Sequence, residues 1–449
     1  MLDMIGVGPF ITLPLLLSAM GGPQAMLGWI LGALLALCDG LVWAELGAAM
    51  PEAGGTYQFL RRIYPGRLGR LLAFLFVFQL TFSAPLSVAS GSIGLAQYAG
   101  YIAPSLTLHT HTFGRIVAAP FTLVAIASVI LAVVLLYRNL SHLKLVSYVL
   151  WTTVMATIAW ILVTALLHGH LHLAFSFPPG AFHLDRAFFA GLASAMLIAT
   201  YDFWGYYNIT FLGAEVRDPA RTIPRAILLS IAIVAVLYLA LNTAVLTVLP
   251  WQPLLSAQNL DARRALISVF IAQAYGPAHG LLLGKLAAIL IIVTAFASIF
   301  SLLLGYSRIP YAAARDGSFF PIFGRLHPTR NFPHIALLYL GAAAILFCFF
   351  SLADVIAALV VLRIVLQFLL QHIGVMYLRR TQPHLPRPFR LWLYPIPPLL
   401  AIAGFIFILF RRANSWPQLL FAAAVAALGT GIFLLRRPLA TIGSTPRSS

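Results

Sequence analysis

The chain has 449 residues, of which 61% are hydrophobic and only 9% are charged. A soluble domain could not bury so much apolar surface, so this composition excludes an ordinary globular protein and predicts an all-α integral membrane protein. The formal net charge of +17 would suggest nucleic acid binding in a soluble protein, but here the basic residues gather in loops between apolar segments and indicate topology instead.

Twelve apolar segments, separated by short polar loops, are long enough to cross a hydrocarbon core of roughly 30 Å. They span residues 1–19, 25–50, 68–102, 116–136, 144–167, 186–213, 225–249, 280–307, 334–351, 355–378, 392–410 and 417–435. Because apolar segments begin at the first residue and no polar region is long enough for a soluble domain, neither a cleavable signal peptide nor a second domain is expected.

Lysine and arginine are distributed unequally between the two sides of these segments. The loops after the even-numbered segments and the tail 436–449 hold 20 of the 28, the opposite loops hold six, and Lys285 and Arg363 lie within segments. The positive-inside rule therefore predicts a multi-pass protein of the plasma membrane with both termini in the cytoplasm.

The first apolar segment is interrupted near its start. Residues 4–10 (MIGVGPF) place two glycines and a proline in a run that would otherwise form a continuous helix. Proline lacks an amide hydrogen and glycine tolerates non-helical angles, so the helix is expected to break. In a membrane such a break requires freed backbone groups to be buried in protein or to face a wet cavity, which makes it a candidate site. A simple kink or a small-residue packing surface is the alternative.

The sixth segment carries a similar interruption. Residues 201–208 (YDFWGYYN) place polar, aromatic and glycine residues where apolar ones are expected. Paired interrupted helices in corresponding positions of two halves indicate the central site of a transporter built from inverted repeats. Two unrelated kinks are the alternative.

Backbone amides freed by a helix break can bind a substrate carboxylate without a cationic side chain. We expect Gly6, Val7 and Gly8 to do so, with Asp202 beside the substrate ammonium. An intramembrane carboxylate is costly and hence a functional candidate, although Asp202 could instead pair with Lys285 or Arg363. The predicted substrate-binding residues are Ile5, Gly6, Val7, Gly8, Tyr201, Asp202, Gly205 and Tyr206.

Four further residues are candidates for gating or coupling. Phe203 and Trp204 could close over a solute, although packing is the simpler role for an aromatic side chain. Lys285 could alternate its protonation or snorkel toward the membrane surface. Glu45 lies near the cytoplasmic end of its segment, where a structural role at the interface is the simpler interpretation.

One arginine, Arg363, lies inside the tenth segment. Because arginine stays charged, it must find a partner there, and Asp354 or backbone carbonyls are the candidates. The sequence alone assigns Arg363 no role.

Metal-binding and enzymatic patterns are weak in this sequence. The histidines in the two outward loops could bind a metal, but solvated loop residues are the simpler interpretation; they are His109, His111, His168, His170 and His172. The sequence contains no Walker, GxSxG or HExxH pattern, so we expect neither ATP-driven nor hydrolytic chemistry, and no cofactor. Cys38 and Cys348 lie in apolar segments and predict no disulfide framework.

Several motifs, in order along nearly the whole chain, resemble those of the amino acid–polyamine–organocation transporter superfamily. They are residues 6–10, 21–23 and 28–29, then 44–46 with Pro51 and 54–57, then 213–219 (GAEVRDP) with 223–226 (IPRA), and finally 307–308 with 314–317 (ARDG). The loop after the sixth segment is the most specific of these.

This resemblance implies a LeuT-type fold: twelve transmembrane helices, with helices 1 and 6 broken. Residues 1–435 would form one transporter domain, with inverted five-helix repeats at 1–167 and 186–378, two extra helices at 392–435 and a cytoplasmic tail at 436–449. It also implies proton-coupled or exchange transport by alternating access. Tyr201 matches the family's aromatic gate and residues 6–8 match its carboxylate-binding turn, while Lys285 could stand where cation-coupled relatives bind sodium.

The chain departs from the family pattern in two places. Tyr207 stands where some basic-amino-acid exchangers have an acidic residue, which argues against an arginine exchanger, although Asp202 could compensate. Relatives also carry half a helix and a tail before the glycine turn, whereas only residues 1–5 precede it here. A start codon recorded too late is the favoured explanation; a truly shortened helix 1 would place transport competence in doubt.

The sequence therefore predicts a proton-coupled amino acid permease whose partners are the small-molecule substrate, protons and membrane lipid, not nucleic acid. A polyamine or organic cation transporter of the same fold is the first alternative, and a sensor that binds solute without moving it is the second. A membrane enzyme is third, because the intramembrane acids are too few and too scattered for an active site.

Overall fold

The computed structural model describes residues 4–52, 54–108, 110–113, 115–138, 143–211, 213–255, 259, 263–412 and 415–436. Its long helices are α3 (Met26–Ala49), α5 (Gly66–Ile102), α6 (Pro120–Arg138), α7 (Leu143–His168), α9 (Arg186–Phe203), α10 (Pro219–Val248), α13 (Leu266–Tyr306), α15 (His334–Phe347), α16 (Leu352–Arg363), α17 (Leu369–Thr381), α18 (Ile396–Arg411) and α19 (Trp416–Leu435). Shorter helices are α1 (Gly8–Ile11), α2 (Leu13–Met20), α4 (Thr56–Ile63), α8 (Leu171–Ala174), α11 (Trp251–Leu255) and α14 (Arg308–Arg315).

Eight helical stretches of the described chain are long and apolar enough to cross a membrane, and α15 and α18 are shorter apolar helices. Many large aliphatic side chains on the outer faces of these helices are exposed, as on α6, α7 and α19. Apolar side chains on the outer surface of a helical bundle are stable when lipid is the solvent. The prediction of an all-α, multi-pass membrane protein is therefore confirmed.

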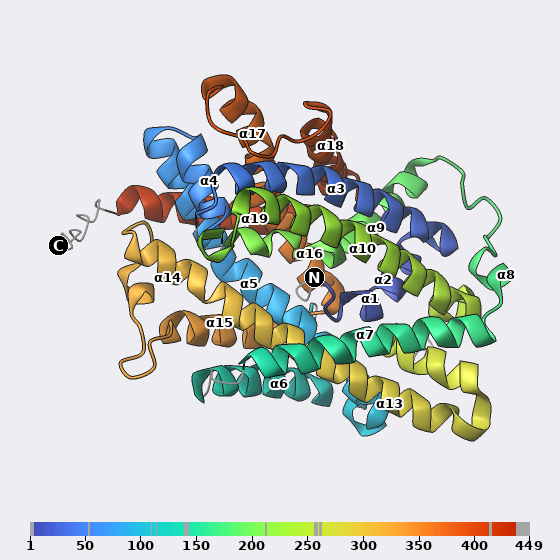
Figure 1. Cartoon of the computed structure of the whole chain (residues 1–449). Helices are drawn as coiled ribbons and strands as arrows, with labels where there is room; N and C mark the ends of the chain where they lie inside the picture. The colour runs from blue at the N-terminus through green and yellow to red at the C-terminus, as the bar shows by residue number, and fades with distance from the viewer. Residues whose placement is uncertain are drawn as a thin grey trace.

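The first and sixth predicted segments are both broken, and both breaks lie in the interior. α1 is a single turn that begins at Gly8 and is followed directly by α2, and Figure 1 shows α1 near the middle of the bundle. α9 ends at Phe203 because Trp204 is extended and Gly205 has a φ of 124°, an angle that favours glycine. The chain then continues as a 3₁₀ helix over Tyr206–Phe211.

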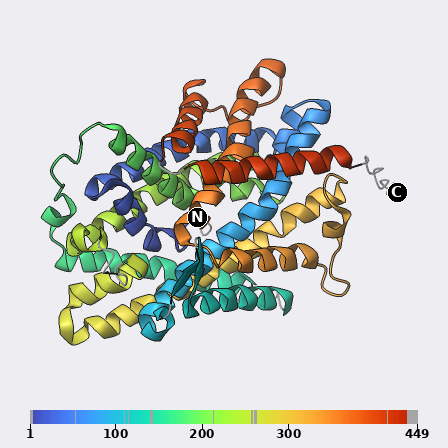
Figure 2. The same ribbon diagram turned by 180° about the vertical axis from the view of Figure 1, so that it is seen from behind.

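Two pairs of long helices pack side by side around these breaks. α3 lies along α10, and α5 crosses α13, as Figure 1 shows. α9 lies against α2, α3 and α18. On the opposite side, seen in Figure 2, α19 in red runs across α5 and α16. The breaks are thereby enclosed by helices that are distant in sequence.

The predicted boundaries were wrong in two segments. Residues Ile116–Ala118, predicted to begin a helix, form a strand that pairs antiparallel with His111–Phe113, and the helix begins at Pro120, the first helical position that proline favours. The eighth segment begins at Leu266 rather than at residue 280. Its helix is kinked at Gly276, whose φ is 69°, and the following proline interrupts the periodic pattern.

The tenth segment contains a feature that the sequence does not reveal. α16 and α17 form one continuous helix, joined by a π-helical stretch at Ile364–Phe368 immediately after Arg363. Such stretches are rare and frequently lie at functional sites.

Candidate functional site

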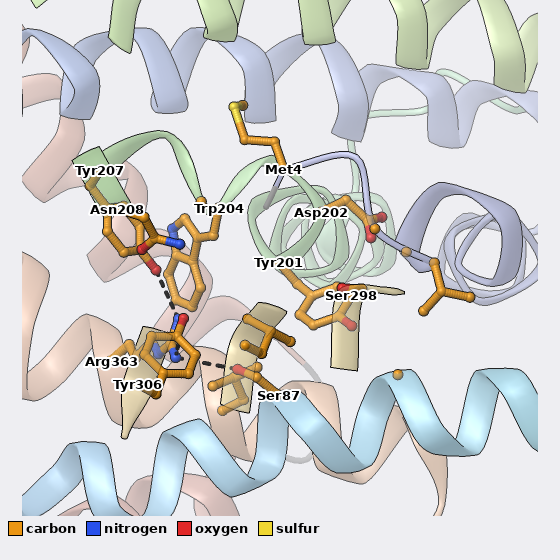
Figure 3. A pocket seen from close by; sticks show the side chains of 17 residues that line it. Met4, Ser87, Tyr201, Asp202, Trp204, Tyr207, Asn208, Ser298, Tyr306 and Arg363 are labelled. Atoms are coloured by element: carbon orange, nitrogen blue, oxygen red, sulfur yellow. Dashed lines mark hydrogen bonds between the residues drawn. The ribbon is translucent and has the colours of Figure 1, made fainter. Parts of the chain in front are cut away.

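A cavity with an empty volume of about 550 Å³ lies where the breaks after α9 and before α1 meet. Figure 3 shows its wall, with Asp202 and Tyr201 near α1 and with Arg363 and Tyr306 at the other end. The lining residues are Met4, Gly6, Val7, Gly8, Ser87, Gly91, Tyr201, Asp202, Trp204, Gly205, Tyr207, Asn208, Ser298, Leu302, Tyr306, Leu359 and Arg363.

The turn before α1 presents backbone groups to this cavity. The Tyr238 hydroxyl donates to the Met4 carbonyl, and the Tyr98 hydroxyl donates to the Phe10 carbonyl at 2.7 Å, so side chains hold the turn at both ends. Among the described residues, the amides of Gly6 and Gly8 donate no hydrogen bond. Free amides beside a cavity can bind an anionic group.

Asp202 is 3% exposed and lies against that turn. Its Oδ2 accepts a hydrogen bond of 2.6 Å from the Thr12 hydroxyl, whereas Oδ1 has no partner in the described chain. A Cβ on Gly8 would overlap this free oxygen, so only glycine allows the approach. The alternative that Asp202 pairs with Lys285 or Arg363 is not observed, because neither forms an ion pair with it. A buried, half-satisfied carboxylate faces the cavity.

Arg363 is 3% exposed and donates to four hydroxyl groups. Its Nε donates to Ser83 at 3.3 Å, Nη1 to Tyr207 at 2.8 Å, and Nη2 to Ser87 at 3.2 Å and Tyr306 at 3.0 Å. The prediction of Asp354 or backbone carbonyls as its partner was wrong. Asp354 instead accepts from the Ser351 hydroxyl at the start of α16, one helix length away from Arg363.

The aromatic residues after the α9 break have different positions. Trp204 lines the cavity, stacks on Phe368 with ring centroids 4.7 Å apart, and lies 5.6 Å from the Arg363 guanidinium. Tyr201 also lines the cavity, and its hydroxyl is 2.8 Å from that of Ser90. Phe203 points away and packs against aromatic residues of α3 and α10.

Three other predicted substrate-binding residues are distributed around the break. Gly205 lines the cavity, Ile5 is buried beside it without lining it, and Tyr206 turns away toward α3. Val7 lines the cavity together with the two glycines that flank it.

The two charged gating candidates lie outside the cavity wall. Glu45 accepts from Arg379 at 2.9 Å through Oε1, and from the amide of Leu391 at 2.8 Å, and Arg387 lies 3.5 Å from it. These contacts hold the end of α3 to the end of α17 and the chain that follows. Lys285 is half-buried on α13 and forms no ion pair with any described residue.

A second polar cluster, formed by Asp39, Tyr206 and His372, lies behind the break. The Tyr206 hydroxyl donates to Asp39 Oδ2, and His372 Nε2 is 3.3 Å from Asp39 Oδ1. His372 Nδ1 faces the Phe368 carbonyl at 2.8 Å. A carbonyl can only accept, so Nδ1 carries a hydrogen, and a neutral ring then presents a lone pair at Nε2. Neither Asp39 Oδ1 nor His372 Nε2 has a hydrogen-bond partner in the described chain, so a proton between them would relieve the repulsion of two lone pairs at 3.3 Å.

A larger cavity, with an empty volume of about 1680 Å³, adjoins the first. Both share Gly205, Asn208, Leu302 and Tyr306 in their walls. The larger one continues past Tyr206 to α14 and to residues 326–333. The two cavities therefore adjoin on the side that carries α14.

Several lining residues were not predicted from the sequence. Ser87 and Gly91 come from α5, and Ser298 and Tyr306 come from α13, where single small or polar residues do not stand out. His372 had a detectable signal, because Gln367, Gln371 and His372 place polar groups within an apolar segment.

The outward histidines give no metal site among the described residues, where no three His, Cys, Asp or Glu side chains gather. His109 lies outside the described residues. The rings of His170 and His172 are 5.8 Å apart.

The sequence is similar to known proteins along nearly its whole length. A family model described as amino acid permease matches residues 1–442. The branched-chain amino acid permease BcaP of Bacillus subtilis is 25% identical over 422 residues, 91% of this chain and 86% of that protein. The serine/threonine exchanger SteT of the same organism is 26% identical over 411 residues, 90% and 86%. Solute carrier family 7 member 13 of Mus musculus is 28% identical over 409 residues, 87% and 78%.

Proposed function

This chain belongs to the amino acid permease family, and we propose that it moves amino acids by alternating access, driven by the proton gradient. The chain is a multi-pass membrane protein that transports amino acids, as the family and the relatives named above indicate. The observation that carries the mechanism is the meeting of two broken helices at one cavity, with free amides on one side and the Asp202 carboxylate beside them.

In this proposal the broken helices hold the backbone of the amino acid. The amides of Gly6, Val7 and Gly8 bind the α-carboxylate, and Asp202 Oδ1, which lacks a partner, accepts from the ammonium. Tyr201 and Trp204 line the path and close over the substrate. Three other residues support the helices around the site: Phe203, Ile5 and the ion-paired Glu45. Glu45 joins α3 to α17 on one side of the site.

We further propose the twelve-helix arrangement of two inverted repeats. The broken α1–α2 and α9–3₁₀ segments would add two spans to the ten apolar helices. The pairing of α3 with α10 and of α5 with α13 supports repeats at 1–167 and 186–378, because each pair joins corresponding members of the two halves. Helices α18 and α19 would then be the two extra helices.

The proposed location is the plasma membrane, with both termini in the cytoplasm and lipid around the bundle. The excess of arginine in the loops on the α14 side supports this orientation. The larger cavity would then open toward the cytoplasm, which supports an inward-open conformation.

We place the coupling proton between Asp39 and His372. Tyr206 lines the larger cavity and also donates to Asp39, so it connects this pair with solvent and with the break after α9. Cys38 and Tyr207 are the other titratable side chains nearby, on α3 and on the 3₁₀ helix, and the Phe405 ring of α18 covers His372. Loss or gain of this proton would change the contact between Asp39 and Tyr206, which fixes the position of the chain after the α9 break.

The substitution Asp39→Asn should separate proton coupling from substrate binding. In Asp39→Asn the pair can no longer share a proton, so an imposed proton gradient should stop stimulating uptake, while counterflow exchange of labelled for unlabelled amino acid continues. Both are measured in the same proteoliposomes. Gradient stimulation equal to that of the wild type would rule out this pair as the coupling site.

A polyamine substrate is disfavoured by a specific contact. Arg363 places a buried cation in the cavity wall, and a polycation would be repelled by it at low dielectric.

Uptake of a labelled amino acid mixture into proteoliposomes, with and without an inward proton gradient, tests the proposed function. We expect saturable uptake that the gradient stimulates. Saturable binding without any uptake would favour a sensor over a transporter.

A further inference from the structure

The buried guanidinium of Arg363 has no anionic partner in the described part of the chain. Four of its contacts are neutral hydroxyls, and its remaining close neighbours are the rings of Trp204 and Tyr306, at 5.6 and 5.2 Å. The intramembrane acids are engaged elsewhere, Asp202 with Thr12, Asp39 with Tyr206, and Glu45 with Arg379.

A buried cation without a counter-ion is energetically unfavourable, and arginines in membrane segments usually pair with an acidic residue or with backbone carbonyls. Hydroxyls and ring faces reduce this penalty but do not neutralise the charge. A guanidinium carries five N–H donors, and its four hydrogen bonds leave one N–H of Nη1 without an acceptor among the described residues. Arg363 therefore has both a charge and a donor available to a ligand.

The charge and the free N–H of Arg363 lie in the wall of the proposed substrate cavity. Arg363, Tyr306 and Ser87 form one end of the wall, and Asp202 with the turn before α1 forms the other, as Figure 3 shows. If the α-carboxylate and ammonium occupy the end near α1, the substrate side chain extends toward Arg363. The π-helical stretch that begins at Ile364 directly follows this residue.

We propose that Arg363 is a specificity residue that binds an anionic side chain, so that the preferred substrates are acidic amino acids such as glutamate and aspartate. This proposal rests on the proposed function and names its substrate class. The guanidinium would form a charge-assisted pair with the second carboxylate, and the hydroxyls of Ser83, Ser87, Tyr207 and Tyr306 hold it in position for that contact.

The test compares L-glutamate with L-glutamine, which has the same shape without the charge. Wild-type protein in proteoliposomes should take up labelled glutamate, and unlabelled glutamate and aspartate should compete much better than glutamine, asparagine or leucine. In Arg363→Gln the apparent affinity for glutamate should fall at least about 30-fold, the lower limit for removing one partner of a buried charge pair. Arg363→Lys should recover part of this loss, because lysine keeps the charge without the planar fork.

Arg412→Gln is the matched control, because Arg412 is also buried but contacts Gln418 between α18 and α19. It should transport glutamate like the wild type. Thermal stabilisation of the detergent-solubilised protein by glutamate, and its absence in Arg363→Gln, would support binding independently of flux.

Four outcomes would overturn the proposal. Uptake of neutral amino acids without uptake of glutamate would refute it while leaving the amino acid permease function intact. An equal loss for glutamine and glutamate in Arg363→Gln would place the α-carboxylate, rather than a side chain, at Arg363. Neutral amino acid uptake that requires chloride, lost when gluconate replaces it, would place an inorganic anion there. Absence of all amino acid uptake would refute both this proposal and the proposed function.

Discussion

Asp202→Asn should reduce uptake of every transported amino acid at least about 30-fold, with or without a proton gradient. The substitution keeps the shape of the side chain and its contact with Thr12, but it removes the charge that the proposed site offers to the substrate ammonium. Because all amino acids share that ammonium, the loss should not depend on the side chain of the substrate. Initial rates over a range of substrate concentrations measure it.

The matched control for this charge removal lies at the N-terminal end of the same helix. Asp185 precedes α9, is exposed, and its Oδ1 accepts from the amide of Phe188 at 2.7 Å. Asparagine caps a helix about as well as aspartate, so Asp185→Asn should transport normally. If Asp202→Asn retained wild-type affinity, the carboxylate would have no part in substrate binding.

The second large effect is expected from a single methyl group at Gly8. In Gly8→Ala the new Cβ would lie 3.0 Å from Asp202 Cγ and would overlap Oδ1, with Tyr201 Cε1 only 3.5 Å away. The turn or the carboxylate must shift, and either movement separates the free amides from Asp202. We expect uptake to be abolished while the protein still reaches the membrane, as measured by uptake together with surface expression.

Gly431→Ala provides the comparison for this prediction. Gly431 lies within α19, and a Cβ there would meet no atom within 4 Å. Alanine should favour the helix by up to about 1 kcal/mol, so expression and uptake should be unchanged or improved. Wild-type uptake by Gly8→Ala would mean that the close approach of this turn to Asp202 is not needed.

Much of the fold could be predicted because lipid imposes simple demands on sequence. Long apolar stretches identify most membrane helices, and a glycine with a proline, or a glycine among aromatic residues, identifies the two breaks. The boundaries failed where local geometry overrides hydropathy, as at Pro120 and at the Gly276 kink, because a hydropathy pattern contains no information about backbone angles.

The candidate site was only partly predictable for a different reason. Residues 6–8 and Asp202 can be recognised as irregularities in an apolar sequence, and they line one cavity. Ser87, Ser298 and Tyr306 are ordinary residues whose importance depends on how α5 and α13 pack. The partners of Arg363 could not be found by charge matching, because the structure surrounds it with neutral hydroxyls.

The π-helical stretch Ile364–Phe368 determines which way two distant side chains face. Each residue of an α-helix turns the chain by about 100°, so an additional residue accommodated in a π turn rotates everything after it by that angle. Arg363 reaches the cavity before this stretch, and His372 meets Asp39 after it. The deletion of one residue from the stretch would therefore turn His372 away from Asp39 without altering either side chain.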